Sequence, residues 1–191
     1  MNIKKILINS FKEGLEAVKP ENIIKNSLPE PPKGRTFVIG AGKAAASMAK
    51  AIEVNWPRNL PLNGSVITRY KHSLKTKKIK IYESGHPMPD TAGMKAANNF
   101  INNMQELNNN DLLLCLISGG GSSLMTVPQD GLNIKDLRNV TKDLLNCGAE
   151  ISEINTVRKH LSKIHGGKVP IYTKAKIVSL IISDVTGNRI T

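Results

Sequence analysis

The sequence predicts a doubly wound α/β fold, in which a mostly parallel sheet carries helices on both faces. Segments of strand length alternate along the 191-residue chain with longer segments of helical periodicity. The strands are apolar on both faces, as residues 112–117 show, and this pattern is typical of parallel strands covered by helices. The expected fold is therefore Rossmann-like, with its ligand site at the carboxyl ends of the strands.

The expected elements follow in chain order. An amphipathic helix is predicted over 2–18, and the prolines at 20, 29, 31 and 32 predict a non-helical linker. The predicted strands are 36–39, 65–68, 79–82, 112–117 and 177–182, with the last of them buried. Four further helices are predicted. One begins with the small residues after position 42 and ends near Val54, one follows Asp90, one follows Asn133, and one spans 150–164.

Length and composition narrow the class of protein. The length suits one domain, or one domain and part of another. No apolar run is long enough to span a membrane, and residues 1–10 lack a signal-peptide core. The cysteines, Cys115 and Cys147, indicate buried or half-buried thiols in a reducing cytoplasm. The net charge of +12 comes from scattered lysines without aromatic platforms, so it does not indicate a nucleic-acid partner.

A glycine loop follows the predicted strand 112–117. It consists of Ser118, Gly119, Gly120, Gly121, Ser122 and Ser123. Consecutive glycines allow a tight backbone turn that directs several N–H groups toward one point, and the hydroxyls add donors. This composition predicts an anion cradle, most naturally for phosphate. The alternative is a flexible glycine turn without a ligand.

A second glycine motif, Gly40-x-Gly42-x-x-Ala45, follows the first predicted strand. Its spacing fits a dinucleotide fingerprint, but the next strand ends at Arg69 instead of the acidic residue that would hold a ribose. Lys43 is expected in the first turn of the following helix, where a cation opposes the helix dipole. This position suggests that Lys43 neutralises a phosphoryl group or a carboxylate. A solvated surface lysine is the alternative.

Three further groups are candidates for chemistry. His86, in a rigid loop with Asp90, could act as acid, base or ligand, or be a hydrogen-bonded structural histidine. Asp184, after the last strand, could meet a metal–phosphate or a substrate hydroxyl, or cap a turn. One helix face carries a polar stripe that could line an anion site or simply face water: Asn155, Arg158, Lys159 and Ser162.

Five segments together resemble the class II glycerate kinases, and they occur in the order of that family. They are VIGAGKAAASMA (38–49), GHPMPDTAG (85–93), LISGGGSSL (116–124), INTVRKHLSKIHGGK (154–168) and LIISDVTGN (180–188). The resemblance implies an active-site role for Lys43 and a phosphate-holding role for residues 118–123. It also places the side chains of Asn155, Arg158 and Lys159 at the cleft.

The resemblance implies phosphorylation of D-glycerate by MgATP to give 2-phosphoglycerate. We therefore expect Lys43 to be catalytic and Gly40 and Gly42 to join the glycine loop in binding the nucleotide phosphates. The expected substrate-binding residues are His86, Asp90, Asn155, Arg158 and Lys159, with Asp184 as a candidate Mg²⁺ ligand.

The chain departs from the family pattern in two places. Asn188 stands where the family usually has an acidic residue, and the family's second domain does not follow. Residues 1–191 are thus expected to form an N-terminal α/β domain that is inactive alone. A separately encoded second half or self-association would complete it. Two alternatives remain, an NAD(P)H-dependent hydroxypyruvate reductase and a non-catalytic remnant.

Overall fold

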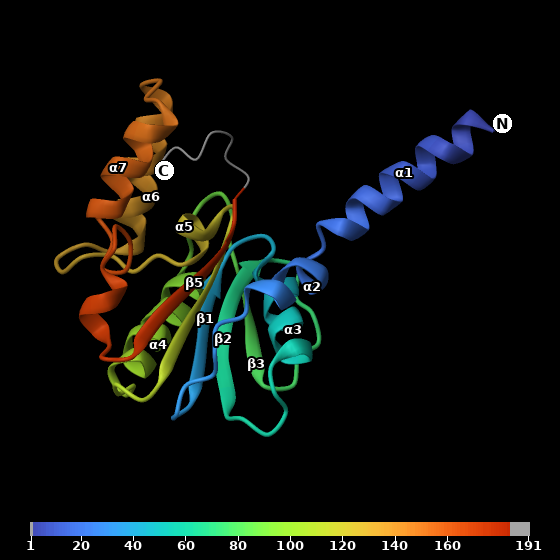
Figure 1. Cartoon of the computed structure of the whole chain (residues 1–191). Coiled ribbons are helices and arrows are strands. Elements are labelled where there is room, and N and C mark those ends of the chain that lie inside the picture. The colour runs from blue at the N-terminus through green and yellow to red at the C-terminus, as the bar shows by residue number, and fades with distance from the viewer. Residues whose placement is uncertain (1, 184–191) are drawn as a thin grey trace.

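The structure is a computed structural model that describes residues 2–183, and it has one five-stranded sheet (Figure 1). The strands are β1 (Thr36–Ala41), β2 (Leu62–Arg69), β3 (Ile79–Ser84), β4 (Leu112–Ser118) and β5 (Lys176–Ile182). They pair in the order β3-β2-β1-β4-β5, and every pair is parallel. The predicted fold class is confirmed.

Helices cover both faces of the sheet (Figure 1). The α-helices are α1 (Ile3–Ala17), α2 (Pro20–Ile23), α3 (Ala45–Asn55), α4 (Thr91–Gln105), α5 (Gly121–Leu124), α6 (Ile134–Asn146) and α7 (Ile151–His160). Two 3₁₀ helices are η1 (Ile24–Ser27) and η2 (Val169–Tyr172). One apolar core lies between the sheet and α3, around Met48 and Ile52, and the other lies under α4, around Phe100 and Met104.

Several local predictions are confirmed. Asp90 caps α4 by accepting a hydrogen bond from the N–H of Gly93, and Asn133 caps α6 in a capping box with Asp136. Cys115 is buried in β4, where burial raises the pKa of its thiol to about 11. These caps fix where two of the helices begin.

Three predictions about elements are wrong. Part of the expected linker is helical, because Pro20 occupies the first turn of α2, where its missing N–H costs nothing, and Ile24 is buried. The helix predicted over 150–164 is shorter and ends at His160. Ser162 therefore leaves the predicted polar stripe, is buried, and pairs with Pro128 in an isolated bridge.

Two predictions of burial are also wrong. Cys147 is exposed, at the carboxyl end of α6. β5 is an edge strand whose side chains alternate between half-buried and exposed, and Ile181 is 65% exposed. Of the described elements, only β4 pairs with β5, so its other edge carries unpaired backbone groups.

Helix α1 forms as predicted but covers nothing in the described chain. No residue of α1 is buried, and the helix projects away from the sheet (Figure 1). Its apolar side chains are exposed, including Ile3 at 67%, Leu7 at 65% and Phe11 at 68%. An apolar helix face of this kind normally packs against another surface.

Candidate functional site

Three loops meet at the carboxyl edge of the sheet: those after β1, β3 and β4. β1 and β4 are neighbours in a register that pairs Gly40 with Leu116 and Ala41 with Ile117. Their loops, which hold Lys43 and the glycine loop, therefore leave the sheet side by side. The structure thus brings together motifs that lie about eighty residues apart in the sequence, at the place where α/β sheets bind ligands.

The loop after β1 is hydrogen-bonded to the glycine loop. The N–H of Lys43 donates to the carbonyl of Gly119 at 2.9 Å, and the N–H of Ala44 donates to the hydroxyl of Ser118 at 3.0 Å. Gly42 has a φ of +140°, and a Cβ atom on it would collide with Ser118. Gly42 is therefore required for the contact between the two loops, and the two motifs form one structural unit.

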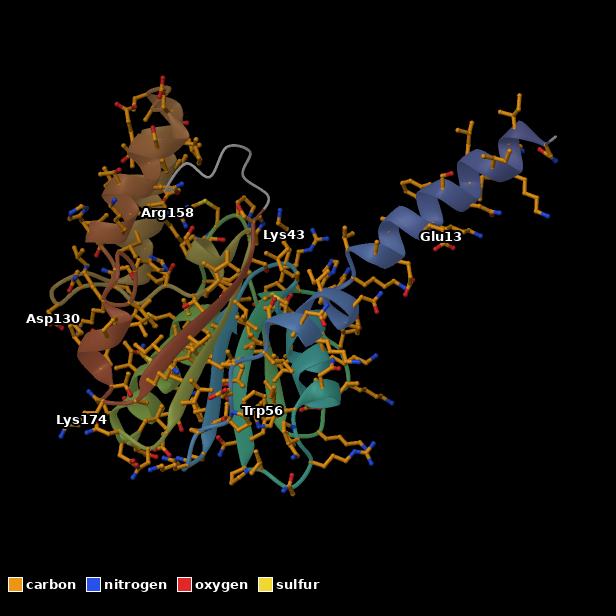
Figure 2. The ribbon with its side chains drawn as sticks, in the orientation of Figure 1. Glu13, Lys43, Trp56, Asp130, Arg158 and Lys174 are labelled. Atoms are coloured by element: carbon orange, nitrogen blue, oxygen red, sulfur yellow. The ribbon has the colours of Figure 1, made fainter. Side chains whose placement is uncertain are left out.

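Lys43 lies in the turn between β1 and α3, with an exposed side chain. α3 begins at Ala45, so the prediction that Lys43 occupies the first helical turn is wrong by two residues. The lysine still stands at the N-terminal end of the helix and next to the glycine loop. Figure 2 shows Lys43 and Arg158 toward the same end of the molecule, while Trp56 and Lys174 lie toward the other end.

The imidazole of His86 packs directly on the glycine loop. Gly120 has a φ of +85°, and a Cβ atom on it would lie 2.7 Å from both Cδ2 and Nε2 of His86. Real Cβ atoms do not approach other atoms so closely, so glycine is needed here for the backbone angle and for the room that the ring takes. The histidine and the glycine loop, both predicted as site residues, are in contact.

The three serines of the glycine loop differ in their surroundings. Ser118 and Ser123 are buried, and Ser123 donates to the carbonyl of Gly120 at 3.1 Å. Ser122 is exposed. Gly121 and Ser122 are the first residues of α5, so their N–H groups have no acceptor within the helix. Of these two residues Gly121 is buried and Ser122 is exposed, so the donors of Ser122 are the ones open to an anion.

Asp90 organises the loop after β3. Its carboxylate accepts hydrogen bonds from the Tyr70 hydroxyl at 2.8 Å, the Ser84 hydroxyl at 2.9 Å, and the N–H groups of Gly85 at 2.8 Å and Gly93 at 2.9 Å. Burial acts to raise the pKa of Asp90, but these hydrogen bonds outweigh it and lower the pKa below its usual value. The four contacts make Asp90 a support for the loop, and its predicted contact with substrate stays a prediction.

Arg158, on α7, lies next to α6 and the loops of the site. It lines a small cavity together with Pro89, Thr126, Thr141 and His165. Burial lowers the pKa of its guanidinium, and its Nη2 is buried without a hydrogen-bond partner among residues 2–183. Since Pro89 belongs to the loop after β3 and Thr126 follows α5, the cavity connects α7 to two of the site loops.

Asn155 and Lys159, the other site residues predicted on α7, are half-buried. The side chain of Lys159 lies against Gly166, and its carbonyl accepts a hydrogen bond from Nζ of Lys168 at 3.2 Å. Within the described residues, neither Asn155 nor Lys159 is hydrogen-bonded to the glycine loop. Asp184, the predicted metal ligand, lies outside the described residues.

Sequence reasoning missed two groups at this edge of the sheet. Tyr70 supports Asp90, and no local pattern around it indicated a partner twenty residues away. Lys135, Arg138 and Lys142 form a row of cations on α6, and their spacing of three and four residues was a signal that a charge-pattern search would have found. His165 was likewise not predicted to belong to the site.

The pKa of His165 predicts a stability loss in mild acid. Its Nε2 lies 2.6 Å from the carbonyl of Met125 and donates to it, and burial lowers the pKa of the ring from 6.5 to about 4. As the pH falls below 6.5, the unfolded chain takes up a proton that the folded chain does not, so the folded state becomes less stable. We expect the free energy of unfolding to fall by up to about 3 kcal/mol between pH 6.5 and pH 4.

Urea unfolding at pH 7.5, 6 and 5 measures this effect. His165→Gln keeps an N–H donor for Met125 but cannot titrate, so its stability should depend less on pH than that of the wild type. Equal pH dependence in the two proteins would show that His165 is not responsible.

The family model described as "Domain of unknown function (DUF4147)" matches residues 6–191. The chain belongs to this family. A D-glycerate 2-kinase from Thermotoga maritima is 40% identical over 191 residues, which cover 99% of this chain and 46% of the relative. A relative from Agrobacterium vitis that carries a hydroxypyruvate reductase name is 44% identical over 98% of this chain and 43% of its own length.

The crystal structure of the glycerate kinase from Thermotoga maritima matches this DUF4147 chain with a TM-score of 0.89 and 41% sequence identity. The matched region covers 98% of this chain and 45% of the chain in that structure. The chain therefore spans less than half the length of these relatives and corresponds to their N-terminal part. These matches confirm the resemblance to the glycerate kinase family. They also confirm the α/β fold class expected from the sequence.

No helix in residues 2–183 is long and apolar enough to cross a membrane. In the same part of the chain, no group of three or more His, Cys, Asp or Glu side chains could hold a metal ion.

Proposed function

We propose that the chain forms the N-terminal part of an ATP-dependent glycerate kinase that converts D-glycerate to 2-phosphoglycerate. The observation that carries this proposal is the interlocked pair of loops, in which the backbone of Lys43 and Ala44 is bonded to Gly119 and Ser118. This unit brings the exposed Lys43 next to the glycine loop, of which Ser122 is exposed, at one point of the sheet edge. The names of the relatives support the choice of reaction.

In this proposal the site acts by positioning and by stabilising charge. The glycine loop and Lys43 hold the phosphoryl group as it moves from the terminal phosphate of ATP to the 2-hydroxyl of glycerate. In the same proposal His86, which packs on Gly120, would accept the hydroxyl proton. Arg158 contributes positive charge behind the loops, toward the glycerate carboxylate.

Mg²⁺ is expected with ATP, since kinases hold this ion through nucleotide phosphates and one or two carboxylates. Residues 2–183 offer no cluster that could hold it, and Asp184 lies outside that range. Within residues 2–183 the ion would therefore be held mainly through the nucleotide phosphates.

We infer that the missing wall of the cleft comes from sequence equivalent to the second half of the relatives, in the same chain or encoded separately. Two surfaces would receive it: the exposed apolar face of α1 and the unpaired edge of β5. Self-association through these surfaces is the alternative. We also propose a cytoplasmic location, because Cys115 and Cys147 are free thiols and a reducing compartment keeps thiols unpaired.

A hydroxypyruvate reductase is the second candidate, because one relative carries that name and because Gly40 and Gly42 have dinucleotide-fingerprint spacing. Against it, Arg69 ends β2, where a ribose-binding carboxylate is expected. A Cβ atom on Gly40 would collide with Leu116, and one on Gly42 with Ser118, so contact with β4 already accounts for both glycines. A non-catalytic remnant is the third candidate.

Calorimetric titration of the 191-residue chain with ATP and with NADH separates these candidates. The kinase proposal predicts binding of ATP, weakened in Lys43→Ala, and no saturable binding of NADH. Binding of NADH without ATP would support the reductase, and binding of neither would support the remnant.

A further inference from the structure

A groove separate from the two interlocked loops runs between the loop after β3 and helix α6. Its volume is about 460 Å³. We call it the α6 groove, and it is lined by Met88, Lys135, Arg138, Asn139, Lys142 and Leu145. Met88 comes from the same short loop as His86, which packs on Gly120 of the glycine loop.

The groove carries uncompensated positive charge. Lys135, Arg138 and Lys142 are three and four residues apart, so their side chains lie along one stripe of α6. All three are exposed, and none has an ion-pair partner within residues 2–183. The stripe extends over about 10 Å of helix, at 1.5 Å per residue.

The acidic residues of α6 do not neutralise this stripe. Asp136 accepts a hydrogen bond from the N–H of Asn133 at 2.8 Å and so belongs to the helix cap. Asp143 lies seven residues further on, along the same side of the helix as Asp136, and does not line the groove. The ligand that fits such a groove is an extended anion with more than one negative charge.

The opposite wall of the groove is held in place. Asp90 bonds to Gly85 and Gly93, and thereby ties both ends of the loop that carries Met88. The packing of His86 on Gly120 fixes the middle of that loop. A groove with one fixed wall and a row of cations on the other is suited to a linear polyphosphate, because each cation can pair with a successive phosphate.

We propose that the α6 groove binds the polyphosphate chain of a nucleoside triphosphate. This inference rests on the proposed kinase function, since it says where the phosphate donor lies. The nucleotide then approaches from the side of α6 and crosses the loop after β3. The glycine loop and Lys43 remain for the phosphoryl group in transfer and for the acceptor.

The test is calorimetric titration of the 191-residue chain with ATP, with inorganic tripolyphosphate and with inorganic phosphate. The triple variant Lys135→Gln, Arg138→Gln, Lys142→Gln should weaken binding of ATP and tripolyphosphate by at least about 30-fold, because three charge-assisted contacts are lost. Binding of single phosphate should change by less than about 3-fold, because one phosphate cannot span the row of cations.

A matched control removes the same charge elsewhere. Lys75→Gln, Lys77→Gln, Lys78→Gln takes three exposed cations from the loop before β3 and should leave the affinity for ATP within about 3-fold of the wild type. Equal weakening in both triple variants would show that only net charge matters and would overturn the proposal. Unchanged affinity in the α6 variant would also overturn it, provided that circular dichroism shows a folded protein.

The outcomes also separate this inference from the proposed function. Phosphorylation is measured in a chimera of this chain with the C-terminal half of the Thermotoga maritima relative. If Lys43→Ala removes glycerate phosphorylation by the chimera while the α6 variant binds ATP normally, the kinase function stands and the groove assignment fails. If the α6 variant loses tripolyphosphate binding but the folded chimera phosphorylates no glycerate, the groove assignment stands and the kinase function fails.

Discussion

Replacing Lys43 with alanine is expected to lower kcat/KM for glycerate at least about 100-fold, because removal of one charge-stabilising group from a preorganised site costs two to three orders of magnitude. The measurement uses a chimera of this chain with the C-terminal half of the Thermotoga maritima relative. The melting temperature should change little, since Lys43 is exposed and its backbone makes the contact with Gly119. That backbone contact survives the substitution.

Lys50→Ala is the matched control, because Lys50 is an exposed lysine on α3, seven residues away. It should leave the turnover within about 2-fold of the wild type, as expected for a surface substitution. If Lys43→Ala melted at a much lower temperature while its folded fraction kept full activity, the role of Lys43 would be structural.

Gly120→Ala is expected to weaken ATP binding, through loss of the contact with the terminal phosphate, while the helical content stays intact. The new methyl group would meet the ring of His86, and the φ of +85° would add strain of about 1–3 kcal/mol. The loop must therefore shift, which displaces its N–H groups and the imidazole of His86 from the positions in which they would contact the phosphate. Isothermal titration with ATP and circular dichroism measure the two effects.

Gly131→Ala supplies the control for backbone strain. Gly131 has a φ of +82°, close to that of Gly120, but a Cβ atom there meets nothing within 4 Å. The two variants should thus lose similar stability, and only Gly120→Ala should lose affinity. Unchanged ATP affinity in Gly120→Ala would mean that the glycine loop does not bind phosphate.

The sequence was sufficient to predict the sheet and the edge at which the site lies, because both depend on local patterns. Leu112–Ile117 is apolar on both faces, and β4 is buried on both faces. Asp90 and Asn133 are capping residues, and α4 and α6 begin after them. Such signals lie within a few residues of the element that they specify.

The contacts that build the site could not be predicted in this way. The packing of His86 on Gly120 joins the loops after β3 and β4, two strands that are not neighbours in the sheet. The polar stripe on α7 left two alternatives open, an anion site or a face toward water, and the structure half-buries Arg158 against residues from other segments. Burial of a long polar side chain depends on tertiary packing, which helical periodicity does not encode.

The most direct test of the central claim, that this chain is one half of a glycerate kinase site, is a coupled assay of ADP release with ATP, Mg²⁺ and D-glycerate. The 191-residue chain alone should show no turnover, because water and reactants are not enclosed. The chimera with the C-terminal half of the Thermotoga maritima relative should release ADP in step with 2-phosphoglycerate. Steady turnover by the chain alone that disappears in Lys43→Ala, or a folded chimera without any glycerate-dependent ADP release, would contradict the account.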